Sequence, residues 1–326
     1  MANPCKAYPI DPGLIPVFDR SGKANLGQVL ENSSCIGTAP LVFEIEPLFR
    51  SEQHLDMNEQ SRTSNRVAQR VLSRREALQL TGSIAATMIV SRHMLAVETS
   101  RKVVVWSEGT ANVDPASKKV YPEDINTAIA EGLAPLKSEN WQIIKASLND
   151  PEQGLADDLL KSTRVLIWWG HKKHGEVKNE LVDKIEKRVK EEGMGFIGTH
   201  SAHFSKALKK LLGTPCSWRE YVDDGSSAEI IVKEPNHPIC KGVSNFKLPG
   251  IERYGEPFKV PPPESVPLEG IYTKPGGTNE NARMGLCWTV GKGKVFYFTP
   301  GHETYNDYYR PEVRRIFVNA VKWASS

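Results

Sequence analysis

Three apolar segments of this chain each run directly into a histidine, and this pattern constrains the fold more than any other feature. In chain order they span Val165 to His171, Gly195 to His200 and Val295 to His302. Unbroken runs of β-branched and aromatic residues are typical of strands that are buried on both faces of a parallel sheet. In an open α/β sheet, ligands bind in the crevice outside the carboxyl ends of the strands. The sequence therefore predicts that the three histidines converge in one pocket.

Two further histidines, His174 and His203, follow within a few residues, so five of the eight histidines lie just beyond expected strand ends. For any single one of them a surface or capping role is an equally good interpretation, because imidazole is common in both places. Five in the same topological position favour a functional, imidazole-rich pocket.

The composition is that of an ordinary globular protein. The chain has 326 residues, enough for one large domain or two modest ones, and its 42 Lys and Arg nearly balance its 39 Asp and Glu. We therefore expect no nucleic-acid partner. The five cysteines are widely spread and form no CxxC pair, which argues against a disulfide scaffold or a zinc knuckle. Whether Cys216 and Cys240 pair is left open.

From residue 101 onward, strand-like and helix-like segments alternate. This pattern predicts a mostly parallel sheet with helices on both faces. After about residue 217 the chain changes to short strands with Pro- and Gly-rich turns, which indicates a β-rich insertion. Strong strands return at Gly285–Val290 and Lys294–Thr299, joined by a tight turn, and a last helix is expected at Pro311–Ala324. We expect one α/β domain over residues 101–326.

Residues 73–100 resemble a twin-arginine export signal. Ser73, Arg74 and Arg75 precede a short apolar run, Leu80–Val90. That run is too short to cross a membrane, which takes about 20 residues. We expect export by the twin-arginine route, to a periplasmic or membrane-tethered location, and a cytoplasmic location if the signal is not functional. The alternative is an amphipathic helix that begins near Ser73 and packs on the domain formed by residues 101–326.

Residues 1–72 show no sustained helical or strand period. Twin-arginine signals begin close to the N-terminus, so we interpret this segment as a disordered extension or a mis-assigned start, with translation beginning at Met57. Membrane contact is expected only through the export signal.

Four short motifs within residues 101–326 resemble motifs of a known family. They are Trp168–His171, His200–Phe204, His237–Ile239 and Gly301–Tyr305, in that order. The chain resembles the ThuA-like (trehalose utilisation) family over residues 101–326. The resemblance implies a flavodoxin-like fold similar to class I glutamine amidotransferases. It also implies a role in bacterial disaccharide metabolism, with oxidised 3-keto-glycosides as the expected substrates.

The chain departs from the amidotransferases at their nucleophile. The equivalent sharp turn falls at His200–Ser201 and contains no cysteine, whereas His302–Glu303 resembles the later catalytic pair. Without a thiolate, glutaminase chemistry is not expected. Ser201 with His302 as its base would allow acyl transfer, although the flanking residues are not those of a GxSxG elbow.

Two chemistries suit the predicted pocket. One is a single divalent metal, with zinc favoured, which polarises a carbonyl or activates water. The other is general acid–base catalysis by histidine. The candidate metal ligands are His171, His200, His203 and His302. The candidate catalytic residues are His200, His302, Glu303 and Glu256. The candidate substrate-binding residues are Glu108, Trp169, His174, Ser201, Tyr254 and Tyr305.

Together these expectations describe an exported bacterial enzyme of hydrolase, lyase or isomerase type with a small carbohydrate substrate. No nucleotide cofactor is indicated, and a homo-oligomer is compatible with the sequence. The alternative is a non-catalytic carbohydrate-binding module with the same pocket. The aromatic residues Trp218 and Tyr254 can grip a sugar ring or, equally, pack beneath the insertion.

Overall fold

The computed structural model describes residues 101–326. The expected export signal, the proposed start at Met57 and the first 72 residues lie outside this range. Within it, no helix combines the length and the apolar character that crossing a membrane requires.

The centre of the molecule is a nine-stranded sheet whose first half is parallel. Its order is β2-β1-β3-β4-β11, the flavodoxin-like order in which the second strand lies outside the first. The bounds of these strands are β1 Arg101–Ser107, β2 Trp141–Ser147, β3 Thr163–Trp169, β4 Gly195–Thr199 and β11 Gly293–Phe298. The predicted α/β fold class with a mostly parallel sheet is confirmed.

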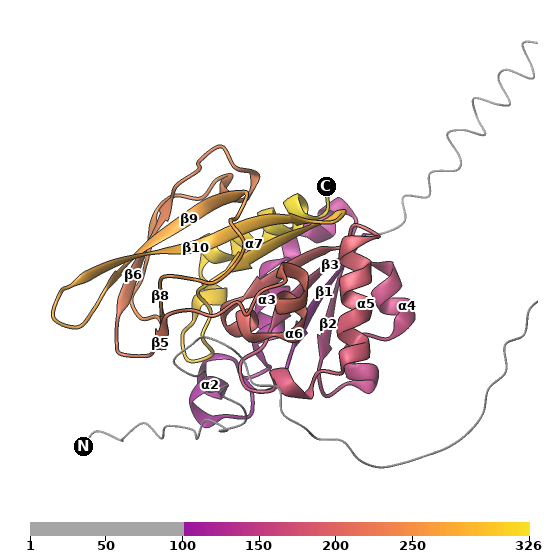
Figure 1. Ribbon diagram of the computed structural model, residues 1–326. Helices are drawn as coiled ribbons and strands as arrows, with labels where there is room; N and C mark the ends of the chain where they lie inside the picture. The colour runs from indigo at the N-terminus through magenta and orange to yellow at the C-terminus, as the bar shows by residue number, and fades with distance from the viewer. Residues whose placement is uncertain (1–100) are drawn as a thin grey trace, which may run out of the picture. The chain divides into compact units, whose positions relative to one another are not determined.

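The β-rich insertion extends the same sheet with antiparallel strands. Figure 1 shows this extension projecting away from the helix-covered part. Its strands, in sheet order after β11, are β10 Asn279–Val290, β9 Ser265–Thr273, β6 Ser227–Val232 and β7 Phe246–Leu248. Two short strands, β5 (Glu220–Val222) and β8 (Arg253–Gly255), form a separate antiparallel pair.

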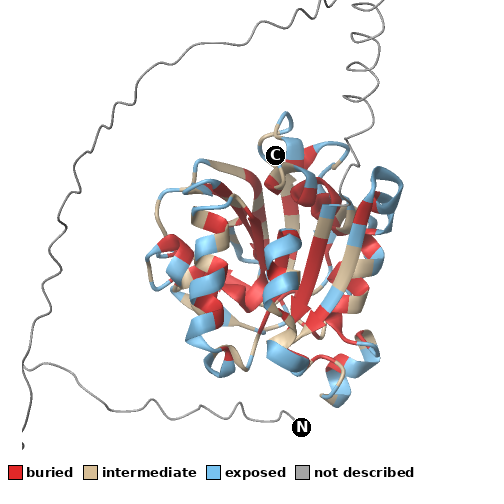
Figure 2. Cartoon of the chain, turned by 90° about the vertical axis from the view of Figure 1, so that its right-hand side faces the viewer, coloured by how far each residue is buried: buried red, intermediate tan, exposed pale blue. Residues whose placement is uncertain are grey.

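Helices cover both faces of the parallel half (Figure 2). Helices α3 (Ile125–Gly132) and α7 (Pro311–Ala324) pack into one core, and helices α4 (Asp157–Ser162), α5 (Asn179–Lys190) and α6 (Lys206–Leu212) pack into the other. One more α-helix of residues 101–326 is α2, Pro115–Val120. Short 3₁₀ helices lie at η1 Ala134–Glu139, η2 Pro151–Gly154, η3 His174–Glu176, η4 His200–Phe204, η5 Pro238–Cys240 and η6 Asp307–Tyr309.

Strand β1 shows why the apolar runs have no polar break. Val103 and Val105 point into the core that contains α3 and α7, whereas Val104 and Trp106 point into the core that contains α5. Successive side chains of a strand alternate between faces, so a strand covered on both sides needs apolar residues throughout. Trp106 also stacks on Trp168 of the neighbouring strand, with ring centroids 3.7 Å apart.

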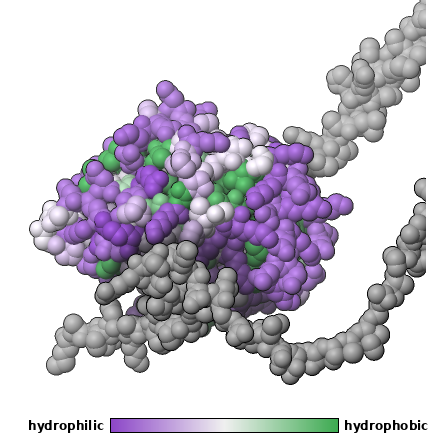
Figure 3. Space-filling view, in the orientation of Figure 1, coloured by the Kyte–Doolittle hydropathy of each residue, from purple (hydrophilic) through white to green (hydrophobic). Residues whose placement is uncertain are grey.

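Helix α5 shows the opposite pattern, with one buried stripe and a charged outer face. Leu181, Ile185 and Val189 recur at helical spacing and are buried. Lys190 pairs with Glu186, one turn earlier, on the outer side. The surface formed by this part of the molecule is strongly hydrophilic (Figure 3).

The spacing of the apolar residues predicts helices over Pro122–Leu136 and His203–Leu212, and both begin later than that in the structure. The segment predicted as a helix from Pro122 becomes α3, because Asp124 has a φ of +77°, outside the helical region. The helix expected from His203 begins at Lys206, where the side chain of Ser205 caps it by accepting the Leu208 N–H. The residues between β4 and this helix, His200–Phe204, form the 3₁₀ turn η4, which carries two of the candidate histidines.

Candidate active site

Three histidines meet at the carboxyl ends of β3, β4 and β11, which are neighbours in the sheet. The ring centroids of His171 and His302 are 5.1 Å apart, those of His200 and His302 are 5.2 Å apart, and those of His171 and His200 are 5.6 Å apart. The predicted convergence of these three residues is confirmed. The parallel topology explains it, because all three strands end at the same edge.

Glu303 completes a group of four. One ligand atom from each of His171, His200, His302 and Glu303 lies within 4.8 Å of every other. The side chains of His200 and Glu303 are only 1% and 4% exposed, whereas those of His171 and His302 are 21% and 11% exposed. A small molecule that approaches the cluster from solvent would therefore first contact the side chains of His171 and His302.

Glu303 and His171 form a tight pair within the cluster. Nδ1 of His171 lies 2.6 Å from Oε1 of Glu303, and Nζ of Lys172 lies 3.2 Å from the same oxygen. Burial by itself raises the pKa of Glu303, but the hydrogen bond from His171 and the charges of His302 and His171 lower it to about 2. Burial by itself lowers the pKa of His171, but the hydrogen bond and charge of Glu303 outweigh burial and raise that pKa. The pair therefore favours a protonated imidazole beside a carboxylate.

His302 behaves differently although it lies beside the same carboxylate. Its Nδ1 bonds the hydroxyl of Thr304 at 2.8 Å, and its Nε2 lies 3.7 Å from Oε2 of Glu303. Burial lowers the pKa of His302, and the attraction of Glu303 does not fully offset it. Two adjacent imidazoles, His171 and His302, therefore have pKa values shifted in opposite directions.

His200 stands at the sharp turn that immediately follows β4. Its φ is +54°, in the left-handed region that costs a residue with a side chain about 1–3 kcal/mol. The hydroxyl of Tyr297 donates to its backbone oxygen at 2.7 Å, and its ring stacks on Tyr254 at 5.4 Å. Its pKa lies well below the ordinary value, because the ring is fully buried and other histidines lie nearby.

Glu252 is a site residue that the sequence did not reveal. Its Oε2 lies 3.3 Å from Nε2 of His200, and its side chain is 11% exposed. Burial raises the pKa of Glu252 to about 7, against the opposing charge of His171. Glu252 precedes β8, a strand of three residues outside the main sheet. A search for histidines and acids after strong strands could not have found it.

His203 lies outside the group of four, and Glu303 takes the place that was expected for it. Nδ1 of His203 lies 3.2 Å from the backbone oxygen of His200 and 3.3 Å from the hydroxyl of Tyr297. Burial lowers its pKa to about 3. The turn η4 directs His200 and His203 to different surroundings, so their spacing in the sequence does not make them joint ligands.

Two predicted carboxylates are held by other groups. Arg283 donates to both oxygens of Glu256, at 2.7 and 2.9 Å, and the geometry does not bring Glu256 into the cluster. Glu108 accepts the backbone N–H groups of Lys172 and Lys173 at 2.6 and 2.9 Å. Glu108 therefore shapes the loop that carries His171.

Three of the predicted substrate-binding residues have structural partners. Nε1 of Trp169 donates to the backbone oxygen of Gly301 at 3.0 Å, which ties β3 to the loop before His302. Oγ of Ser201 lies 2.9 Å from the hydroxyl of Tyr254. Tyr254 is 1% exposed and Trp218 is 7% exposed, so both rings pack beneath the insertion, which was the structural alternative.

The last two predicted substrate-binding residues lie at the sides of the cluster. The ring of Tyr305 is 5.9 Å from that of His302, and its hydroxyl donates to Oδ1 of Asp223 at 2.5 Å. His174 packs against Phe204 at 6.2 Å, and burial lowers its pKa to about 4.

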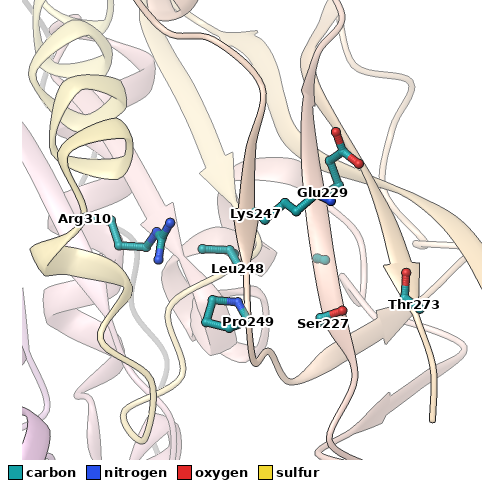
Figure 4. A pocket seen from close by; sticks show the side chains of 8 residues that line it. Ser227, Glu229, Lys247, Leu248, Pro249, Thr273 and Arg310 are labelled. Atoms are coloured by element: carbon teal, nitrogen blue, oxygen red, sulfur yellow. The ribbon is translucent and has the colours of Figure 1, made fainter. Parts of the chain in front are cut away.

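A separate hollow of about 460 Å³ lies in the antiparallel half of the sheet. Arg310, beside the start of α7, contributes one wall, opposite residues of the β6 and β7 segments (Figure 4). None of the four cluster residues lines this hollow. It is therefore a feature distinct from the candidate active site.

Comparison with known proteins gives one family. The model of a family named ThuA and described as trehalose utilisation matches residues 102–324. No curated protein matches the chain.

Similar solved structures share little sequence with the chain. A protein described as ThuA-like from Parabacteroides merdae is 10% identical, with a TM-score of 0.46, over 69% of this chain and 90% of that one. A cytoplasmic protein from Salmonella typhimurium is 14% identical, with a TM-score of 0.45, over 69% of this chain and 99% of that one.

Proposed function

The chain belongs to the ThuA family, described as trehalose utilisation. We propose that it is an enzyme whose substrate is a 3-keto-glycoside, that is, a disaccharide in which C3 of one sugar ring is oxidised to a ketone. The observation that carries this proposal is the geometry of the cluster, in which the rings of His171 and His302 lie 5.1 Å apart beside the buried carboxylate of Glu303, at the carboxyl ends of neighbouring strands. The pKa values of the two imidazoles, shifted in opposite directions, support it. Titratable neighbours with separated pKa values are the usual arrangement of an acid and a base in one active site.

We assign His302 as the base and His171 as the acid. The lowered pKa of His302 favours a neutral ring that can accept a proton, whereas the raised pKa of His171 favours a ring that can give one. These two side chains are also the more exposed members of the cluster. Glu303 orients His171 and stabilises its protonated form.

The chemistry of a 3-keto-glycoside suits such a pair. Its C2 proton is acidic because it lies beside the carbonyl. His302 takes this proton, and the electron pair of the broken C–H bond forms the C1–C2 double bond as the glycosidic C1–O bond breaks. His171 gives its proton to the departing oxygen. An unoxidised disaccharide lacks the acidic proton, so this route does not act on it.

The alternative chemistry is a divalent metal, with zinc favoured, which the cluster also fits. Its four members would then act as metal ligands, and His171 and His302 would not act as acid and base. Three imidazoles and a carboxylate are a donor set that zinc accepts, and Oε2 of Glu303 is a buried oxygen without a hydrogen-bond partner. Donors about 2.0–2.2 Å from a tetrahedral zinc lie roughly 3.4 Å apart, so atoms now within 4.8 Å would have to close slightly. Such an ion, held by His171, His200, His302 and Glu303, would polarise the sugar carbonyl or activate water.

We further propose that the enzyme is exported by the twin-arginine route. Arg74, Arg75 and the short apolar run after them support this. The residues of the candidate active site all lie within residues 101–326.

The test is to incubate purified protein with trehalose and with 3-keto-trehalose and to follow products by NMR. We expect release of glucose from 3-keto-trehalose and no change in trehalose. Binding of either sugar without product formation would instead support the competing class, a non-catalytic carbohydrate-binding module. Cleavage of both sugars at similar rates would contradict the route through the C2 proton.

A further inference from the structure

Tyr221 is an aromatic residue that no part of the proposed chemistry uses. Among residues 101–326, three large hydrophobic residues are exposed, and they are Val113, Tyr221 and Tyr309. Tyr221 is 57% exposed. A single exposed aromatic ring is common on protein surfaces, so its neighbours decide whether it has a role.

The ring contacts of Tyr221 lead directly to the cluster. In the β5–β8 pair, Tyr221 lies opposite Tyr254. Their ring centroids are 6.5 Å apart, and Tyr254 stacks in turn on His200 at 5.4 Å. Cross-strand partners of this kind point to the same side of a sheet. Tyr221 is therefore the solvent-exposed end of a row of rings that begins in the candidate active site.

A carboxylate beyond Tyr221 in the chain, that of Asp223, also lies near the cluster. Asp223 follows β5 and accepts the hydroxyl of Tyr305, whose ring lies beside His302. The negative charge of Asp223 acts on both His302 and Glu252. The end of β5 thus adds an exposed carboxylate to the same side of the molecule as the exposed ring.

The β5–β8 pair is held firmly. Arg253 of β8 is 4% exposed and binds Glu220 at 2.7 Å, Asp224 at 3.3 Å and Glu280 at 3.1 Å. Phe204 also meets the ring of Tyr221 at an interplanar angle of 86°. An aromatic ring held in place before binding loses little conformational entropy when a ligand packs on it.

We propose that Tyr221 is a stacking residue for the second sugar ring of a disaccharide whose first ring lies at the His171–His302–Glu303 cluster. The C–H face of a pyranose packs on an aromatic ring, and its hydroxyls hydrogen-bond to carboxylates such as Asp223. This inference rests on the proposed function, because it takes the sugar class from it. It adds the residue that distinguishes a disaccharide from a monosaccharide.

The test is calorimetric binding of trehalose and of methyl α-glucoside, which carries one ring, to wild-type protein and to Tyr221 variants. We expect wild-type protein to prefer trehalose. Tyr221→Ala should weaken trehalose binding about tenfold and leave methyl α-glucoside binding within about twofold. Tyr221→Phe should retain the preference, and Tyr221→Leu should lose it, since only the first keeps the ring. Tyr309→Ala is the matched control, because Tyr309 is also exposed but packs on Tyr121 and Arg314.

A wild-type protein without preference for trehalose, or a Tyr221→Ala variant that keeps the preference, would overturn the stacking role. Neither result bears on turnover of 3-keto-trehalose, which tests the proposed function by itself. Equal weakening of both sugars by Tyr221→Ala would also overturn the inference, because it would place Tyr221 at the first ring.

Discussion

Oε1 of Glu303 lies 2.6 Å from Nδ1 of His171, although 132 residues separate the two in the chain. The contact joins the loop after β3 to the loop after β11, across β4, which lies between them in the sheet. It couples the protonation of the most exposed histidine of the cluster to a buried carboxylate. Several properties of the protein should therefore depend on Glu303.

Glu303→Gln should lower the pKa of His171. Burial by itself lowers that pKa, and it is the hydrogen bond and charge of Glu303 that raise it above the ordinary value. Removing the charge leaves burial dominant, so His171 should lose its proton at a lower pH. NMR titration of the imidazole measures this shift. Glu256→Gln is the control, because Glu256 pairs with Arg283, and an unchanged His171 pKa in Glu303→Gln would contradict the coupling.

If the cluster holds a metal instead of acting as an acid–base pair, protein purified without chelators should contain about one zinc per chain. Elemental analysis of His302→Ala and Glu303→Gln should show that metal reduced or lost, because each variant removes one of four donors. His237→Ala should retain it, since the ring of His237 packs beside Trp323. Full metal content in His302→Ala would place the ion elsewhere.

Glu108→Ala should destabilise the fold and disturb the His171 loop. It leaves the partly buried backbone N–H groups of Lys172 and Lys173 without their acceptor. We expect the free energy of unfolding to fall by about 2 kcal/mol in chemical denaturation. Glu229→Ala, at a half-buried position of β6, is the control. An unchanged free energy of unfolding in Glu108→Ala would show that the loop does not depend on this carboxylate.

Replacing Arg74 and Arg75 together with lysine should keep a reporter fusion in the cytoplasm. Twin-arginine signals require the arginine pair itself and not only its charge. Cell fractionation measures the outcome, and N-terminal sequencing of the native protein shows whether translation begins at Met57. Equal export of the lysine variant would contradict the signal.

The parts of the site that could be predicted are those carried by strong strands. The runs before His171, His200 and His302 are apolar because β3, β4 and β11 are buried on both faces, and parallel strands bring their ends together. Glu303 could be predicted as well, because it is the residue directly after His302 in the chain.

The remaining parts depend on contacts that leave no local signal. Glu252 and Tyr221 belong to the segments of β8 and β5, short strands that pair only through the tertiary fold. Glu256 and Arg283 meet although 27 residues separate them, and that pairing occupies a carboxylate that the sequence offered as catalytic. His203 was expected to join His200 in the cluster, but the η4 turn places its Nδ1 near the hydroxyl of Tyr297 instead.

The central claim is that the cluster carries out the reaction on the sugar. The most direct measurement compares the rate of glucose release from 3-keto-trehalose by wild-type protein, His302→Asn and the control His237→Asn, with folding checked by circular dichroism. The account predicts a loss of at least about a hundredfold in His302→Asn, the usual contribution of a general base, and an unchanged rate in the control. A folded His302→Asn variant with a rate within about twofold of wild type would contradict it.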